Sequence, residues 1–194
     1  QRVIEKYGNY DFFQNIQVLS PMYAGNAGIT VLNQALQETF NPKTVDKNEV
    51  RLGYITFREG DKILQLKNQP DDEVSNGDIG TLVEIVDAKE TEDKKTTIVV
   101  DFDGTFVEYK PDSFSNITLA YCISVHKSQG SEYPIVIMPF AKNQWIMLNK
   151  KLIYTAITRC KNTLILIGNK EVFFQGCNVE ERHQRNTRLV QRIE

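Results

Sequence analysis

The chain has 194 residues, 41% of them hydrophobic and 25% charged, with a formal net charge of -2. This is the composition of an ordinary globular protein, long enough for one large or two small domains, and no apolar run approaches the roughly 20 residues of a membrane span. The cysteines, Cys122, Cys160 and Cys177, are odd in number and lack close paired spacing, which argues against a disulfide framework or a zinc site. We therefore expect a reducing cytoplasm.

The charge is unevenly distributed along the chain. From residue 150 to the end there are nine Lys and Arg against four Asp and Glu, so the rest of the chain is acidic. A basic carboxy-terminal region suits an anionic partner. The tail arginines could equally form a solvated helix face; these are Arg182, Arg185, Arg188 and Arg192.

The first predicted elements form half of an α/β unit. Ile16-Gln17-Val18-Leu19 reads as a buried strand that ends at Ser20-Pro21. A glycine-containing turn over residues 25–28 then leads into a helix. Its apolar face is marked by residues at helical spacing: Ile29, Leu32, Leu36 and Phe40.

From about residue 50 to 110 the pattern changes to short strands and tight turns. Residues 97–102 and 105–109 flank Asp103-Gly104, a strong hairpin signal, and the charged stretch 87–95 is expected at a loop tip. Five or so strands in roughly 60 residues predict a small β-barrel.

After Pro111 the α/β pattern resumes, with a strand at 135–138, a helix at 148–160 and a strand at 164–167. We therefore predict an α/β fold whose first domain is discontinuous, residues 1–49 and 111–194, with an inserted all-β barrel domain at 50–110.

Two segments of the last region carry chemistry. The first is Ser124-Val125-His126-Lys127-Ser128-Gln129-Gly130-Ser131-Glu132, in which Gly130 is expected to stop a short helix. The second is Tyr154-Thr155-Ala156-Ile157-Thr158-Arg159-Cys160-Lys161, a helix with Arg159 at its end. Arginine is always charged and presents a planar fork of donors, which suits a transferring phosphoryl group. Taken alone, such an arginine could also cap a helix or cover an apolar surface.

These segments resemble motifs V and VI of superfamily 1 helicases, and their wording is most similar to the RecD-like branch, the family of the exonuclease V alpha subunit. Residues 18–33 resemble the motif IV segment of that branch, except that Tyr23 stands where a basic residue often follows the Met; it could stack on a base or adenine, or simply fill a loop. Residues 57–65 and 76–80 are similar to the inserted Src-homology-3-like barrel. The resemblance implies a RecA-like second motor domain of the P-loop NTPase type.

The resemblance also implies residue roles. Arg159 would be the catalytic arginine finger, and Gln129, Gly130 and Glu132 would bind nucleotide, with Glu132 accepting from the ribose hydroxyls. The candidate DNA-binding residues are Ser20, Pro21, Ser124, His126, Lys127 and Thr155, with Arg58 and Lys62 from the barrel. Outside this context His126 and Lys127 would read as ordinary surface residues. No metal ligands are expected.

No Gly-x-x-x-x-Gly-Lys-Ser/Thr sequence occurs, so no P-loop is available to cradle phosphates. ATP and Mg²⁺ are therefore expected in a parent protein whose first motor domain lies upstream, and this chain, which opens on Gln1, is expected to bind neither stably. The expected partners are single-stranded DNA, that upstream domain and other nuclease or repair subunits.

The function that follows is the carboxy-terminal motor half of an ATP-dependent 5′–3′ DNA helicase in a bacterial cytoplasm, which is inactive as an ATPase alone. The alternative is a non-catalytic nucleic-acid-binding or partner-docking module of a nuclease or repair complex. In that case the barrel would bind strands through aromatic residues, although their alternation places most in the core: Tyr54, Phe57, Phe102, Phe106 and Tyr109.

Overall fold

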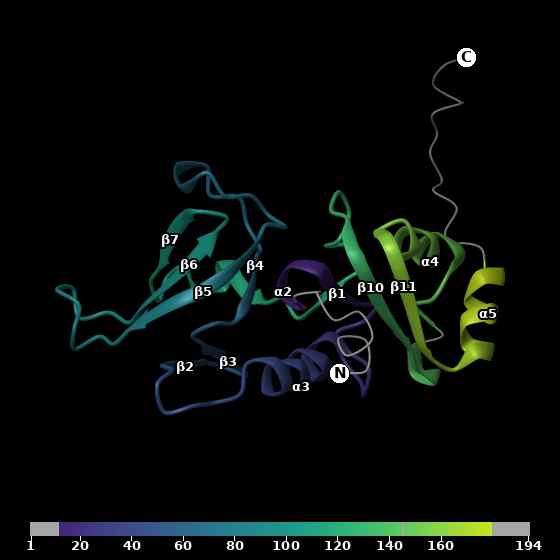
Figure 1. Ribbon diagram of the computed structural model, residues 1–194, viewed down its shortest axis with the longest axis horizontal. Coiled ribbons are helices and arrows are strands. Elements are labelled where there is room, and N and C mark those ends of the chain that lie inside the picture. Colours follow the sequence, from purple (N-terminus) through teal and green to yellow (C-terminus); the bar gives the residue numbers. More distant parts are fainter. Residues whose placement is uncertain (1–11, 145, 180–194) are drawn as a thin grey trace, which may run out of the picture.

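The computed structural model describes residues 12–144 and 146–179, which form two lobes joined side by side (Figure 1). One lobe is built on a parallel four-stranded sheet in the order β11-β10-β1-β9. The other holds an antiparallel five-stranded sheet in the order β7-β6-β5-β4-β8, with the hairpin β2-β3 beside it. The arginines of the basic tail lie outside the described residues.

The parallel lobe contains four strands and four of the helices. Its strands are β1 (Ile16–Ser20), β9 (Cys122–Ser124), β10 (Tyr133–Phe140) and β11 (Cys160–Gly168). Its helices are α2 (Phe12–Asn15), α3 (Ile29–Phe40), α4 (Lys150–Ile157) and α5 (Lys170–Asn178), with a 3-10 turn, η3, at Lys142–Gln144. The predicted strands and the first predicted helix are thus confirmed.

The antiparallel lobe consists of short strands joined by tight turns. The strands are β2 (Glu49–Leu52), β3 (Ile55–Arg58), β4 (Lys62–Gln65), β5 (Ile79–Val86), β6 (Thr97–Phe102), β7 (Thr105–Tyr109) and β8 (Ile117–Leu119). Two 3-10 turns, η1 (Pro70–Asp72) and η2 (Phe114–Asn116), lie between them. The sheet includes β8, which lies beyond the predicted boundary at residue 110; the division into domains stays a prediction.

Local sequence signals account for several of these elements. Asp103 and Gly104 both have positive φ angles, 52° and 97°, as the mirror-image hairpin turn between β6 and β7 requires. Helix α4 begins at Lys150, because the side chain of Asn149 caps it by accepting from the Leu152 amide at 2.9 Å. The helix is therefore shorter than the predicted 148–160.

The segment before Gly130 differs from the prediction. Gly130 has the positive φ expected of a stop residue, 91°, but residues 125–130 form turns and no helix. The physical reason lies in Ser128, whose buried hydroxyl donates to the Val125 carbonyl at 2.8 Å and so satisfies a group that a continuing helix would use.

Two hydrophobic clusters form the core, and the first of them runs through both lobes. It joins Ile16 and Ile135 of the parallel sheet to Ile63 and Leu82 of the antiparallel sheet, each 1% exposed or less. Among the barrel aromatics that sequence analysis singled out, Phe57, Phe102 and Tyr109 are buried, whereas Tyr54 and Phe106 are exposed. Because the core is shared, the two lobes stabilise one another.

A buried polar cluster lies at the same junction. The carboxylate of Asp61, which has no exposed surface, accepts from Gln37 of α3, from Asn41 just after that helix, from the Arg58 amide and from the Tyr121 hydroxyl, at 2.6 to 2.9 Å. Four donors surround a group whose burial would otherwise be costly.

Within residues 12–144 and 146–179, no helix is long and apolar enough to cross a bilayer.

Candidate nucleotide and nucleic-acid site

The register of the parallel sheet shows that the first predicted motif runs between the two edges of the sheet, whereas Arg159 and Cys160 of the second lie at the amino edge. Ser20 at the end of β1 lies beside Ser124 at the end of β9, which marks the carboxyl edge. Tyr133 at the start of β10 lies beside Cys160 at the start of β11, which marks the amino edge. Residues 125–132, called the crossing segment below, therefore run from the carboxyl edge to the amino edge.

Arg159 lies at the amino edge, between α4 and β11. Its guanidinium donates to the carbonyl of Ser131 at 3.0 Å, to that of Thr155 at 3.3 Å and to the hydroxyl of Thr158 at 3.3 Å. Its own carbonyl accepts from the Tyr133 amide at 2.8 Å. The guanidinium is thus held against the end of the crossing segment by three neutral oxygens.

The predicted nucleotide-binding residues Gly130 and Glu132 lie at this edge with Arg159. Both are exposed, and the Glu132 carboxylate lies 3.6 Å from the Lys161 ammonium in an open ion pair. Such an exposed pair contributes little stability and leaves the carboxylate accessible. The structure thus brings together Arg159, Glu132 and Gly130 on one surface.

Gln129 faces a different space, a cleft of about 380 Å³ between the crossing segment and α4. The lining residues are Val125, His126, Gln129, Ile146, Met147, Asn149, Lys151, Leu152 and Thr155. The cleft thus unites two predicted DNA-binding residues, His126 and Thr155, with a predicted nucleotide-binding one. The carbonyl of Thr155 also accepts from Arg159, so Thr155 lies between the cleft and the arginine and contacts both.

Lys127 reaches from the crossing segment to the other lobe. Its ammonium donates to the side-chain oxygen of Asn76 at 2.7 Å, and Asn76 belongs to the loop before β5. Sequence analysis missed this partner, because it lies 51 residues away and no local pattern marks it. The residue nevertheless remains partly exposed on the side of the crossing segment.

Three other predicted DNA-binding residues at the carboxyl edge are buried. Ser20 has no exposed surface and donates to the Ala27 carbonyl at 2.8 Å, while the neighbouring Pro21 is also buried. Ser124 is 8% exposed, and its hydroxyl accepts from the Lys127 amide at 3.2 Å. These side chains thus stabilise the loops at this edge, and their assignment to DNA binding stays a prediction.

Arg58 and Lys62, the two predicted DNA contacts of the barrel, are also buried. They are 3% and 2% exposed, since Arg58 pairs with Glu49 at 2.6 Å and with Glu38 at 3.0 Å, and Lys62 donates to the Ile16 carbonyl at 3.1 Å. A buried cation must be paired, and these two are used to join the lobes.

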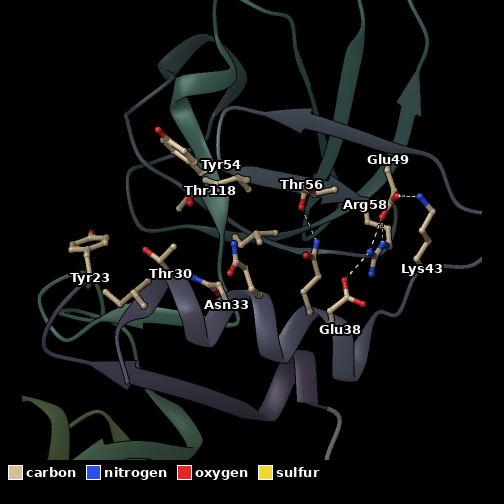
Figure 2. Close-up of a pocket in the computed structure, with 15 residues that line it drawn as sticks. Tyr23, Thr30, Asn33, Glu38, Lys43, Glu49, Tyr54, Thr56, Arg58 and Thr118 are labelled. Carbon is tan, nitrogen blue, oxygen red and sulfur yellow. Dashed lines mark hydrogen bonds and ion pairs between the residues drawn. The ribbon is translucent and has the colours of Figure 1, made fainter. Parts of the chain in front are cut away.

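A second cavity, of about 550 Å³, lies between α3 and the hairpin β2-β3 (Figure 2). Tyr23, in the loop after β1, and Tyr54, at the tip of the hairpin, stand at one end of it, and Lys43, Glu49 and Arg58 stand at the other. Sequence analysis named Tyr23 and Tyr54 separately and gave no sign that they share a cavity, because their positions are 31 residues apart and belong to different lobes.

Comparison with known proteins gives these features a context. The family model described as the ATP-dependent RecD-like DNA helicase SH3 domain matches residues 32–102, and the model of the UvrD-like helicase C-terminal domain matches residues 119–167. An ATP-dependent RecD2 DNA helicase of Deinococcus radiodurans is 35% identical over 178 residues, 92% of this chain and 23% of that protein. The chain belongs to the RecD-like helicase family.

A second relative of this RecD-like chain is the RecBCD enzyme subunit RecD of Buchnera aphidicola, 31% identical over 83% of this chain and 26% of that protein. The chain thus spans about a quarter of the length of the curated relatives it matches.

Solved structures confirm the fold. A Pif1 helicase from Bacteroides, in complex with ADP-AlF3 and ssDNA, has a TM-score of 0.56 and 15% identity over 84% of this chain and 42% of its own. The Pif1 helicase from Candida albicans has a TM-score of 0.55 and 16% identity over 89% of this chain and 48% of its own. The predicted fold class, a RecA-like motor domain with an inserted Src-homology-3-like barrel, is thereby confirmed.

Proposed function

We propose that this chain is the second motor domain of an ATP-dependent 5′–3′ DNA helicase. In the proposal it completes a nucleotide site that an upstream P-loop domain holds, and it helps to grip single-stranded DNA. The placement of Arg159 beside Gly130 and Glu132, at the amino edge of the parallel sheet, supports this reading most directly.

The chemistry of Arg159 fits the role of an arginine finger. Among the residues that the structure describes, its guanidinium bonds to neutral oxygens, those of Ser131, Thr155 and Thr158. A phosphoryl oxygen carries charge and forms the stronger hydrogen bond, so an approaching triphosphate competes well for these donors. ATP would supply the transferred phosphoryl group and Mg²⁺ would neutralise its charge. In this proposal both are held mainly by the P-loop domain, with Glu132 placed to accept from the ribose.

Strand binding is assigned to the exposed side chains near the carboxyl edge. His126 and Thr155 line the cleft, with Gln129 between the two functions. Lys151 also lines the cleft, and Lys127 supplies a further positive charge on the crossing segment. A single lysine contact to phosphate contributes about 0.7 to the slope of log affinity against log salt for single strands. Replacing Lys127 by alanine should therefore flatten that slope by about this amount.

The proposal is tested in the full-length protein with Arg159→Ala and Arg159→Lys. Arginine fingers contribute on the order of 10³ to 10⁵ in rate, so both variants should lose most ATP hydrolysis, because lysine lacks the planar fork. Single-strand affinity should stay within about twofold. Lys170→Ala, an exposed cation on α5, is the control and should hydrolyse ATP normally.

Near-normal hydrolysis by Arg159→Ala would remove Arg159 from the active site and favour a binding or docking module. The 194-residue chain alone should show no DNA-stimulated hydrolysis, since phosphate and metal would lack their cradle. A bacterial cytoplasm, where ATP and chromosomal DNA meet, is the compartment that fits the proposal, and relatives named above come from bacteria.

A further inference from the structure

The cavity between α3 and the hairpin β2-β3 is built from both lobes. Its floor comes from α3, its far wall from Thr56 of β3 and its remaining side from Thr118 of β8 (Figure 2). At about 550 Å³ it falls within the size range of small-molecule sites. Nothing in the proposed ATP or strand-binding role described above uses it.

The mouth of the cavity carries two exposed aromatic rings. Tyr23 is 62% exposed and Tyr54 is 89% exposed, and among the described residues neither ring packs against another aromatic ring. Gly53, with a φ of 62°, makes the turn that lifts Tyr54 to the tip of the hairpin. Flat rings held at a mouth in this way are suited to stacking on another flat ring.

The far end of the cavity carries charges that cancel. Arg58 pairs with Glu49 and Glu38, at 2.6 and 3.0 Å, and Lys43 pairs with Glu49 at 2.5 Å. Two cations and two carboxylates line this end, so it offers no net charge to a phosphate. A neutral ligand group is therefore the better match.

The floor is fixed in place and polar. The side-chain amide of Asn33 exchanges two hydrogen bonds with the backbone of Cys122, at 2.8 and 2.9 Å, and Gln37 donates to the Thr56 carbonyl at 2.8 Å. Thr30 and Gln34, four residues apart on α3, are exposed and both line the cavity, and Figure 2 shows Thr30. Hydroxyl and amide groups of this kind bond to the edges of nucleobases, and a rigid floor lowers the entropic cost of binding.

The cavity opens beside the edge of the sheet already assigned to the strand. Tyr23 follows β1, and His126 follows β9; the two strands are neighbours that end in register. We propose that this cavity binds a nucleobase of the single strand, stacked against Tyr23 and Tyr54, while its edge meets the polar groups of α3. This inference rests on the proposed strand-binding function and assigns the hairpin of the barrel a direct part in it.

The test measures binding of oligothymidine by the full-length protein. Alanine substitution of a stacking residue costs roughly 5- to 150-fold in affinity, so Tyr23→Ala and Tyr54→Ala should each weaken binding within this range. Tyr23→Phe and Tyr54→Phe keep the ring and should bind within about twofold of the unchanged protein. Phe106→Ala removes an aromatic residue, 65% exposed on β7, that does not line the cavity, and should have no effect.

Two further readouts identify stacking. The slope of log affinity against log salt should not change in the alanine variants, because no phosphate contact is lost. A series of oligothymidines with one abasic position each should show one position at which binding by the unchanged protein drops. That sensitivity should vanish in the Tyr23→Ala/Tyr54→Ala double variant.

The outcomes separate the two proposals. If the unchanged protein binds single strands but shows no abasic-sensitive position, and the alanine variants bind equally well, the cavity inference is overturned while the helicase proposal stands. If the alanine variants instead flatten the salt slope, the tyrosines act through phosphate contacts and stacking is also overturned. Failure of the unchanged protein to bind any single strand overturns both proposals.

Discussion

Replacing Asp61 by alanine tests whether the polar cluster between the lobes stabilises the fold. Asp61 is completely buried and accepts four hydrogen bonds, one from Gln37 of α3 and one from Asn41, which follows that helix. Its removal should therefore weaken the junction between the parallel lobe and the barrel, and should destabilise both lobes in one transition.

The magnitude follows from the partners that remain. In Asp61→Ala the amides of Gln37 and Asn41 keep the carbonyls of Thr56 and Glu59, at 2.8 and 3.1 Å, so their loss is small. The Arg58 amide and the Tyr121 hydroxyl each lose a bond to a charged group, worth about 1.5 to 3 kcal/mol. Because the cost of burying the carboxylate also disappears, we expect a net loss of about 3 kcal/mol.

The assay is urea unfolding of the 194-residue chain, read from the midpoint at unchanged slope. Asp112→Ala, an exposed aspartate in the turn after β7, is the matched control and should stay within about 0.5 kcal/mol. A loss below about 1 kcal/mol in Asp61→Ala, equal to that of the control, would refute the reasoning. Two separate transitions in the unchanged chain would refute the shared core.

Three other predictions concern stability and reactivity. Burial raises the pKa of Asp61 above its ordinary value of 3.8, although its four donors act in the opposite direction, so the folded state binds the proton more tightly than the unfolded state does. As the pH rises from 3.8 through the raised pKa, the free energy of unfolding of the unchanged chain should therefore fall relative to that of Asp61→Asn. An increase would contradict this prediction. Gly168→Ala should lower the free energy of unfolding by about 3 kcal/mol, because φ is 130° and a Cβ would lie 2.1 Å from the Phe140 carbonyl oxygen. Gly53→Ala, which has open space around it and a φ of 62°, should lower it by about 1 kcal/mol. Equal losses of the two variants in urea unfolding would refute the clash. Burial also raises the pKa of the Cys122 thiol, so native protein should react with iodoacetamide at Cys160 and Cys177 well before Cys122, as peptide mass analysis would show.

The elements that local pattern controls were predictable from the sequence. The apolar period of α3 and the Asp103-Gly104 turn gave correct positions, because both depend on neighbours within a few residues. The burial of Arg58 and Lys62 was not predictable, because their partners are distant: Glu38 lies 20 residues before Arg58, and Ile16 lies 46 before Lys62. A basic residue in a strand pattern looks the same whether it faces solvent or a buried carboxylate.

The division of the site between two edges was equally hidden. It follows from the register of β1 with β9 and of β10 with β11, and side-chain period alone does not specify register between distant strands. The roles of Arg159, Glu132 and the cleft residues stay predictions, which the resemblance to helicase motifs supplied and the geometry accommodates.

The crossing segment has a mechanical consequence. Its eight residues begin beside the predicted strand contacts and end at Arg159, and its middle is fastened inside the lobe by the fully buried Ser128. Because the segment is anchored at its middle, a displacement of one end moves the other end in the opposite direction about Ser128. We therefore predict that inserting one residue on either side of Ser128 uncouples ligand binding at the two edges while leaving each edge able to bind its own ligand.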